Sequence, residues 1–375
     1  MSPIIVKIYT PQELNHSSYI QTGLFELEKE AFLKTKVVLS FSKRLGTIKV
    51  ATKNIEESNQ PHPKTSFYQL IDTASGRKVN FATDLYDAAN SFSKYALENC
   101  DYIFKRNFET QYVSKLPIEF QQKIYPLGVT FKVNTSFKKN SYKFYVGFFI
   151  TNVLINIKWD SLFFSRLNIT IKSHIQHWKQ AKYINNLTVF ENQATSTEKS
   201  ILFQTRCFSN EDSIDVQQIH QQRYRLIKVL KEKFKEKFKG GIIPSEIAKR
   251  KYKEALTDLP TDSISYLNLV KKTKIVIYTR GLVYSPAWKM AEYLSQGKVI
   301  VAEKLSTELP FPLVHRDDVL FFEDEQEMIS LVKEALQDDL LCEKLSSNSK
   351  NYFDMHVHPK ANVKRIINFM LSQKS

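Results

Sequence analysis

The sequence lacks any apolar run of the roughly 18 residues that a helix needs to cross a bilayer. The longest candidate, residues 144–157 (FYVGFFITNVLINI), is too short and is rich in strand-forming residues. The N-terminal MSPIIVKIYTPQEL has one lysine and none of the architecture of a signal peptide. We therefore expect neither a membrane-spanning segment nor export.

Cysteine is scarce, and the three cysteines are scattered along the chain at Cys100, Cys207 and Cys342. No two of them form a C-x-x-C pair, which indicates a reducing, cytosolic compartment without structural zinc. His174 and His177 lie three residues apart, and His356 and His358 flank a valine. Neither pair has a third ligand nearby, so we expect no metal.

Two nucleotide-binding motifs are also absent. The chain contains no G-x-G-x-x-G and no G-x-x-x-x-G-K-[ST]. These glycine-rich turns bring backbone N–H groups close to the phosphates of dinucleotides and nucleoside triphosphates. Their absence argues against a dinucleotide-dependent oxidoreductase and against a P-loop kinase.

Positive charge, by contrast, is in excess. The 54 Lys and Arg against 39 Asp and Glu give a formal charge of +15, and much of it gathers in residues 223–255. Lys and Glu alternate there at helical spacing, which favours a solvated helix face. The alternative is attraction to an anionic membrane leaflet or to a polyanion. A nucleic-acid-binding protein is one such hypothesis, but no recognised reading motif supports it, and we expect no nucleic-acid partner.

The length of 375 residues and a hydrophobic content of 42% suit two domains, each with its own core. Strands expected at 4–9, 36–42 and 77–84 alternate with helical patterns such as 23–35, which is typical of a parallel α/β layer. After an irregular middle, the alternation resumes at residue 199. We predict an α/β fold with two Rossmann-like domains, residues 1–195 and 196–355, and a C-terminal helix within 356–375.

Residues 278–304 (YTRGLVYSPAWKMAEYLSQGKVIVAEK) read as a strand–helix–strand unit. Gly281 allows a sharp turn and close approach to a ligand, and Ser285 with Pro286 predicts a helix start at 286. The free N–H groups of such a start suit a phosphate, and Arg280 can add a guanidinium to it.

In this helix Lys289 and Glu292 fall on one face. A carboxylate at Glu292 is suited to accepting both hydroxyl hydrogens of a ribose, so the unit has the parts of a site for a nucleoside diphosphate. The alternative is an exposed ion pair between Lys289 and Glu292, which is common and weak. The residues alone leave the two interpretations close to even.

The segment GLVYSPAWKMAEYLSQGKVIV resembles the donor site of glycosyltransferases with the two-domain GT-B fold, in which a K-x-x-E-Y-L-x-x-G-K run recurs. LFQTRCF, QQRYRLIKVLKEKF and the tail NYFDMHVHPKANVKRIINFML extend the likeness more loosely over 199–375. The resemblance implies a central cleft between the domains, with the C-terminal helix crossing back to the N-terminal domain. It also implies a nucleotide-sugar donor bound by the C-terminal half and a glycan or lipid-linked acceptor, in surface polysaccharide or glycoconjugate synthesis. We expect such an enzyme in the cytoplasm, as the cysteines indicate, with its basic surface docked on the inner membrane leaflet.

Carried over by position, the resemblance assigns Glu292 to the ribose and Ser285 with Lys289 to the phosphates. It assigns Arg206 or Arg280 to neutralising the leaving diphosphate. Many retaining members have a second glutamate eight positions before the ribose ligand, where this chain has Tyr284, so the sequence assigns neither inversion nor retention. No D-x-D occurs, which favours a metal-independent reaction without a cofactor.

Three further residues are candidates. Asp84 and Asp87, at the end of a first-domain strand, are candidates for the base that deprotonates the acceptor hydroxyl. The structural alternative, a helix cap and a first-turn charge, is the one that we favour for either residue. Gly23 is expected in a turn that approaches the donor phosphates from the N-terminal domain. A sugar-nucleotide epimerase on the same fold is the remaining alternative to transfer.

Overall fold

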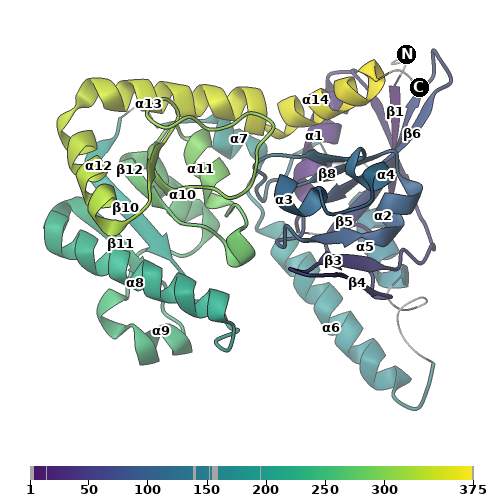
Figure 1. Ribbon diagram of the computed structural model, residues 1–375, viewed down its shortest axis with the longest axis horizontal. Helices are drawn as coiled ribbons and strands as arrows, with labels where there is room; N and C mark the ends of the chain where they lie inside the picture. The colour runs from purple at the N-terminus through teal and green to yellow at the C-terminus, as the bar shows by residue number, and fades with distance from the viewer. Residues whose placement is uncertain are drawn as a thin grey trace. The chain divides into compact units, whose positions relative to one another are not determined.

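The computed structural model describes residues 4–373 apart from 14, 138–140, 152, 154–158 and 195. The chain forms two compact units (Figure 1). The first unit comprises Met1–Leu187, Thr307–Pro310 and Val357–Ser375, and the second comprises Thr188–Ser306 and Phe311–His356. The division falls eight residues before the expected boundary at 195, and the last helix belongs to the first unit.

The second unit is built on a five-stranded sheet in which every neighbouring pair is parallel. The strand order is β11 (Phe238–Ile242), β10 (Glu198–Thr205), β12 (Thr273–Tyr278), β13 (Val299–Glu303) and β14 (Leu320–Phe322). Numbered along the unit, this is the order 2-1-3-4-5 of a doubly wound Rossmann-like sheet. The α/β class predicted from the alternating pattern is therefore confirmed here.

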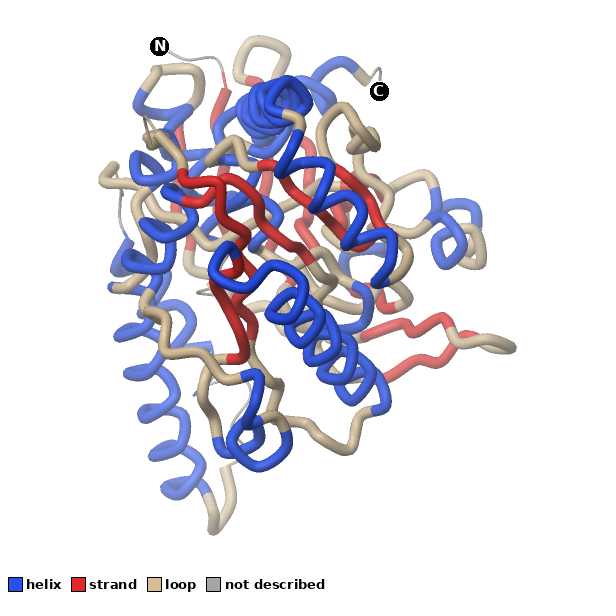
Figure 2. Tube along the Cα trace, turned by 90° about the vertical axis from the view of Figure 1, so that its left-hand side faces the viewer, coloured by secondary structure: helices blue, strands red, loops and turns tan. Residues whose placement is uncertain are grey.

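Helices pack against this sheet (Figure 2). Leucine and isoleucine side chains of α8 (Ile214–Phe234) share one buried core with α12 (Glu325–Gln337), α13 (Asp339–Tyr352) and the strands. The helices α10 (Ser263–Lys272) and α11 (Lys289–Ser295) pack on β12, and α9 (Glu246–Lys251) follows β11.

The first unit has a mixed six-stranded sheet. Its order is β2 (Lys34–Val38), β1 (Ile4–Tyr9), β5 (Thr65–Asp72), β6 (Lys78–Asp84), β8 (Tyr102–Lys105) and β9 (Ile124–Pro126). β5 runs antiparallel to both β1 and β6, while the other neighbours are parallel. The expectation of a fully parallel layer missed β5, because its hairpin with β6 needs only a short turn rather than a crossover helix.

A small antiparallel sheet and several helices complete the first unit. The sheet consists of β4 (Ile55–Ser58), β3 (Thr47–Val50) and β7 (Ser91–Ser93). The helices are α1 (Ser18–Lys29), α2 (Lys94–Asn99), α3 (Thr110–Val113), α4 (Ile118–Gln121), α5 (Ser141–Thr151), α6 (Phe163–Lys182) and α14 (Pro359–Ser372). A further short helix, α7 (Leu187–Glu191), lies where the chain passes to the second unit.

α14 packs against α1 within the first unit, as expected for a C-terminal helix that returns to the N-terminal half. The Tyr19 hydroxyl donates to the carbonyl of Val357 at 2.6 Å, and the Asn362 amide donates to the Tyr19 hydroxyl at 3.0 Å. Gly23 lies in the middle of α1, not in a turn. A Cβ on it would fall 2.4 Å from the carbonyl oxygen of Pro359. The prediction that Gly23 approaches a donor phosphate was therefore wrong: it is a contact point between two helices.

Candidate functional site

The candidate site of the second unit lies at the carboxyl ends of β10 and β12. These strands are neighbours, but the chain leaves β10 toward β11 on one side and continues from β12 toward β13 on the other. Ligands of open α/β sheets bind outside the strand ends at such a reversal. Arg206 directly follows β10, and Arg280 follows β12 after one threonine.

Arg223 of α8 ties these two strand ends together, and the sequence analysis did not single it out. Its guanidinium donates to the carbonyls of Arg206 and Arg280, each at 3.0 Å, and to the Thr279 hydroxyl at 3.3 Å. Burial and the Arg206 charge lower the pKa of Arg223 to about 10. Among the described residues it forms no ion pair with a carboxylate. A buried arginine without a carboxylate partner is costly, so an anion at this point would be favourable.

Lys289 opens α11 and points back to the end of β10. Its ammonium donates to the Gln204 carbonyl and, at 2.9 Å, to the Tyr266 hydroxyl, which in turn contacts the Tyr293 hydroxyl at 2.8 Å. Burial lowers the pKa of Lys289 to about 7, against the opposite effect of Glu292 and with added repulsion from Arg223 and Arg206. The charges of Glu292, Arg206 and Arg223 thus all act on the Lys289 ammonium at the ends of β10 and β12.

Glu292 lies in the first turn of α11. Burial raises the pKa of its carboxyl, and Lys289 acts in the opposite direction. Within the described part of the chain, the carboxylate forms neither a hydrogen bond nor an ion pair. The alternative of a Lys289–Glu292 ion pair is thus not what the structure shows, and Glu292 keeps its acceptors for another group.

The loop between β12 and α11 differs from the prediction. α11 begins at Lys289, not at Pro286, and Trp288 rather than Ser285 occupies its N-cap position. Gly281 has a φ of −85°, and its N–H donates to the Ser285 carbonyl at 2.8 Å. A Cβ on Gly281 would lie 3.0 Å from two Ser285 atoms, so the close approach is to its own loop.

The two residues of this loop that have a positive, left-handed φ are Val283 (φ 52°) and Tyr284 (φ 57°), not Gly281. A β-branched residue with positive φ is strained, and such strain clusters at functional sites. Asp215 of α8 fixes the loop, because one carboxylate oxygen accepts from the Val283 N–H at 2.8 Å and the other from Arg280 at 2.6 Å.

Arg280 is therefore already neutralised. Besides Asp215, its backbone N–H donates to Glu303 at 2.9 Å, and its side chain lies 3.7 Å from the same carboxylate. Arg206 differs, since it is exposed and its guanidinium forms no ion pair with any described residue. Of the two arginines that were predicted to bind an anion, only Arg206 has no ion pair with a described residue, so its charge is available to a ligand.

Asp84 of β6, in the first unit, is buried at 1% exposure. Its carboxylate lies 2.8 Å from the Lys105 ammonium and 3.3 Å from His62, and it caps the N–H of Tyr86 at 3.0 Å. Burial acts to raise the pKa of Asp84, but Lys105 and His62 outweigh it, and the pKa lies well below its usual range. This geometry favours the structural interpretation of Asp84.

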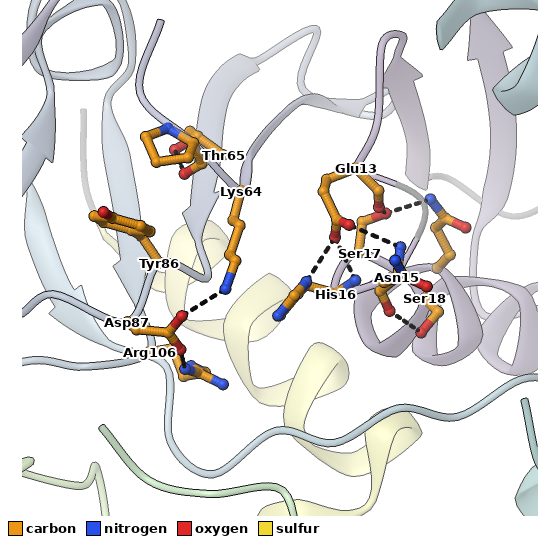
Figure 3. A network of polar contacts seen from close by, with 12 residues as sticks. Glu13, Asn15, His16, Ser17, Ser18, Lys64, Thr65, Tyr86, Asp87 and Arg106 are labelled. Carbon is orange, nitrogen blue, oxygen red and sulfur yellow. Dashed lines mark hydrogen bonds and ion pairs between the residues drawn. The ribbon is translucent and has the colours of Figure 1, made fainter. Parts of the chain in front are cut away.

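Asp87 is less buried, with 24% of its side chain exposed, but it is bound from two sides (Figure 3). Lys64 lies 2.5 Å from one carboxylate oxygen, and Arg106 binds the other. Burial again opposes these charges, yet they lower the pKa of Asp87. A carboxylate held in its charged form by two cations is a weak base.

The described residues contain no group of three or more His, Cys, Asp or Glu side chains that could hold a metal ion. Over the same part of the chain, no helix is long and apolar enough to cross a bilayer.

No family model matches the chain, and no curated protein matches it. Among solved structures, the C-terminal domain of a group 1 family glycosyl transferase from Francisella tularensis aligns at 14% identity and TM-score 0.32, covering 44% of this chain and 94% of that one. An S. aureus MnaA structure with UDP aligns at 10% identity and TM-score 0.34, covering 74% of this chain and 62% of that one. A glycosyltransferase from Rickettsia africae aligns at 10% identity and TM-score 0.37, covering 73% of this chain and 64% of that one.

The chain thus spans less than two thirds of the last two proteins. At these TM-scores the similarities carry no argument about fold or activity. The fold assignment rests on strand order and register, and the candidate site rests on the contacts around Arg206, Arg223, Lys289 and Glu292.

Proposed function

We propose that this chain is a glycosyltransferase of the GT-B class, which moves a sugar from a nucleotide-sugar donor to a hydroxyl of a glycan or lipid-linked acceptor. The observation that carries the proposal is the arrangement at the strand ends of the second unit. Arg206, Arg223 and Lys289 place three cationic groups around one position, next to a carboxylate without a partner among the described residues. A diphosphate and a ribose are the two groups that this combination suits.

The roles follow from the charges. Arg206 and Lys289 bind the diphosphate of the donor, with Arg223 behind them, and Glu292 accepts the ribose hydroxyl hydrogens. When the sugar–phosphate bond breaks, negative charge grows on the departing diphosphate, and cations already in place stabilise it. Arg280, Gly281 and Ser285 act on the donor only indirectly, by fixing the loop that leads into α11.

The base that deprotonates the acceptor hydroxyl is a separate question, for which Asp84 and Asp87 are the candidates. Asp87 keeps some exposure, and it remains the candidate for this role in preference to the buried Asp84. The reaction is proposed to need no metal and no cofactor. Synthesis of a surface polysaccharide or glycoconjugate in the cytoplasm is the setting that fits a lipid-linked acceptor.

The test is a thermal-shift panel of nucleoside diphosphates on the wild type, Glu292→Gln, Arg206→Ala and the surface control Glu246→Ala. Stabilisation of the wild type and the control by one nucleotide is expected, with affinity reduced about tenfold to a hundredfold in the two site variants, as for lost hydrogen bonds to charged groups. If no nucleotide shifts the wild-type curve, or if Glu292→Gln binds as well as wild type, the donor site is wrong. Release of free nucleoside diphosphate that requires added acceptor then distinguishes transfer from epimerisation.

A further inference from the structure

The helices α5 and α6 of the first unit contact each other and fall in the middle segment that showed no regular pattern in the sequence. α6 is the long teal helix of that unit (Figure 1). One stripe of it faces α5, where the His174 ring contacts Tyr145, Phe148 and Phe149. Ala181 is the one residue of α6 that is buried among those whose side chains are described.

A second, exposed stripe of apolar side chains runs beside the first. Phe164, Ile171, Ile175 and Trp178 are separated by seven, four and three positions, which places them on one side of a helix. Their exposed fractions are 80%, 37%, 45% and 44%. Just before the helix, Trp159 and Leu162 are 70% and 57% exposed. A run of large apolar groups at the surface of a protein marks an interaction site.

The charge of α6 is of one sign. The helix carries Arg166, Lys172, Lys179 and Lys182 and no Asp or Glu. Lys172 and Lys179 are exposed and form no ion pair with any described residue. Arg166 is paired with Asp160 of the preceding turn at 2.9 Å, so the positive charge that α6 offers to a partner is that of Lys172 and Lys179.

The basic segment 223–255 is different. Lys228 lies 3.9 Å from Glu254, and Arg250 and Lys251 lie 2.5 and 2.6 Å from the two oxygens of Glu211. Much of the charge that stood out in the sequence is thus neutralised within the same unit, as a solvated helix face would be. If a basic surface of this chain meets an anionic partner, α6 is the better placed.

We propose that α6, together with the turn that holds Trp159 and Leu162, lies flat in the headgroup region of an anionic lipid bilayer. A helix with aromatic and aliphatic groups on one side, lysines beside them and no acids is the kind that binds in the plane of a membrane interface. Its 20 residues include four cations, so it is too polar to cross.

A second copy of the chain fits this surface less well. Pairing α6 with itself would bring its lysines near those of the other copy, and no acid on the helix would offset the repulsion. An anionic bilayer satisfies both features at once, since it takes up the apolar stripe and attracts the lysines by about fivefold in affinity for each. The assignment does not depend on the donor site of the second unit.

The experiment is co-sedimentation of the full chain with vesicles of phosphatidylcholine alone or with a quarter phosphatidylserine. The variants are Phe164→Ser with Ile175→Ser, which breaks the apolar stripe, and Lys172→Glu with Lys179→Glu, which reverses the charge. The matched control, Lys228→Glu with Lys249→Glu, makes the same change in net charge on the segment 223–255. Circular dichroism and a thermal melting curve without ligand verify that each variant is folded.

Wild type and control are expected to bind the vesicles with phosphatidylserine, while both α6 variants lose tenfold or more in affinity. Because two of the three tryptophans, Trp159 and Trp178, belong to this surface, their fluorescence should shift to the blue on binding. The proposal is overturned if the α6 variants bind as wild type does, or if the control loses as much. It is equally overturned if wild type ignores lipid and forms a dimer that Phe164→Ser with Ile175→Ser dissociates.

Discussion

Lys289 shows how one side chain can link the charge of a site to pH. In the free protein it is surrounded by Arg206 and Arg223 as well as by Glu292, and its pKa of about 7 leaves it partly neutral near physiological pH. If the diphosphate of the donor binds here as proposed, it favours the charged ammonium, so binding takes up a proton.

We predict that the affinity for a nucleoside diphosphate falls as the pH rises from about 7 to about 9, by up to tenfold per pH unit. Calorimetric titrations in two buffers of different ionisation enthalpy measure both the affinity and the proton uptake. Lys289→Arg stays charged throughout and should flatten the dependence. A slope that persists in Lys289→Arg would mean that another group carries the proton.

At the scale of elements, the contact between α1 and α14 depends on the missing side chain of Gly23. Alanine is favoured over glycine inside a helix by about 1 kcal/mol. Here, however, the added methyl would meet the Pro359 carbonyl at 2.4 Å and a Val363 methyl at 2.5 Å. Overpacking of this kind costs about 1–3 kcal/mol and more when backbone must move, so the clash outweighs the propensity.

Gly23→Ala is accordingly expected to destabilise the protein by about 1–3 kcal/mol, measured by urea unfolding. Adding Val363→Ala removes one of the two clashes and should make the double variant less destabilised than the sum of the two single changes. Strict additivity, or a gain in stability from Gly23→Ala alone, would refute the close contact.

Elements with a strong local pattern were predictable from the sequence. β1 matches the strand expected at 4–9, and α14 lies within 356–375, where a C-terminal helix was expected. The start of α11 was predicted three residues early, because Ser-Pro is a common helix opening. In the structure the Ala287 N–H donates to the Tyr278 hydroxyl, and the loop continues to Trp288. β5 was missed, since its pairing with β1 is a contact between segments far apart in the sequence.

In the candidate site, the helical spacing was enough to predict that Lys289 and Glu292 lie on one face. The family resemblance was needed to include Arg206. Arg223 was not predicted, because α8 carries several cations and no local pattern shows that Arg223 is the buried cation among them. The commitment of Arg280 to Asp215 was equally invisible, because the two residues are 65 positions apart. Electrostatic partners across a fold are set by tertiary structure, not by local pattern.

At the scale of the whole molecule, the stability of both units should rise with pH, but over different pH ranges. In the first unit the lowered pKa values of Asp84 and Asp87 stabilise the fold above the unfolded pKa of 3.8, and this contribution is lost as the pH falls through the folded values. In the second unit burial lowers the pKa of Lys289 to about 7 and of Lys298 to about 8. Between these values and 10.5 the unfolded chain holds more protons, so the stability of this unit rises with pH.

We therefore expect the second unit to gain stability from about pH 7 to about pH 9, by up to about 1.4 kcal/mol per pH unit for each lysine, while the first unit weakens only in acid. The unfolding of each unit in urea is measured at several pH values by a short pulse of proteolysis and mass spectrometry of the fragments. This gives the pH dependence of stability for each unit separately. Lys298→Met should reduce the alkaline gain of the second unit. An equal response of both units would contradict the expectation.

The position of α14 in the first unit has a consequence for biosynthesis. Translation at about 5–20 residues per second makes α14 only some tens of seconds after α1 has left the ribosome. Throughout that interval the surface around Gly23 has no cover, whereas the strands of the second unit can already pair. The half of the protein that is made first is thus the half that is finished last, and nascent chains stalled before Pro359 should expose α1 to chaperones.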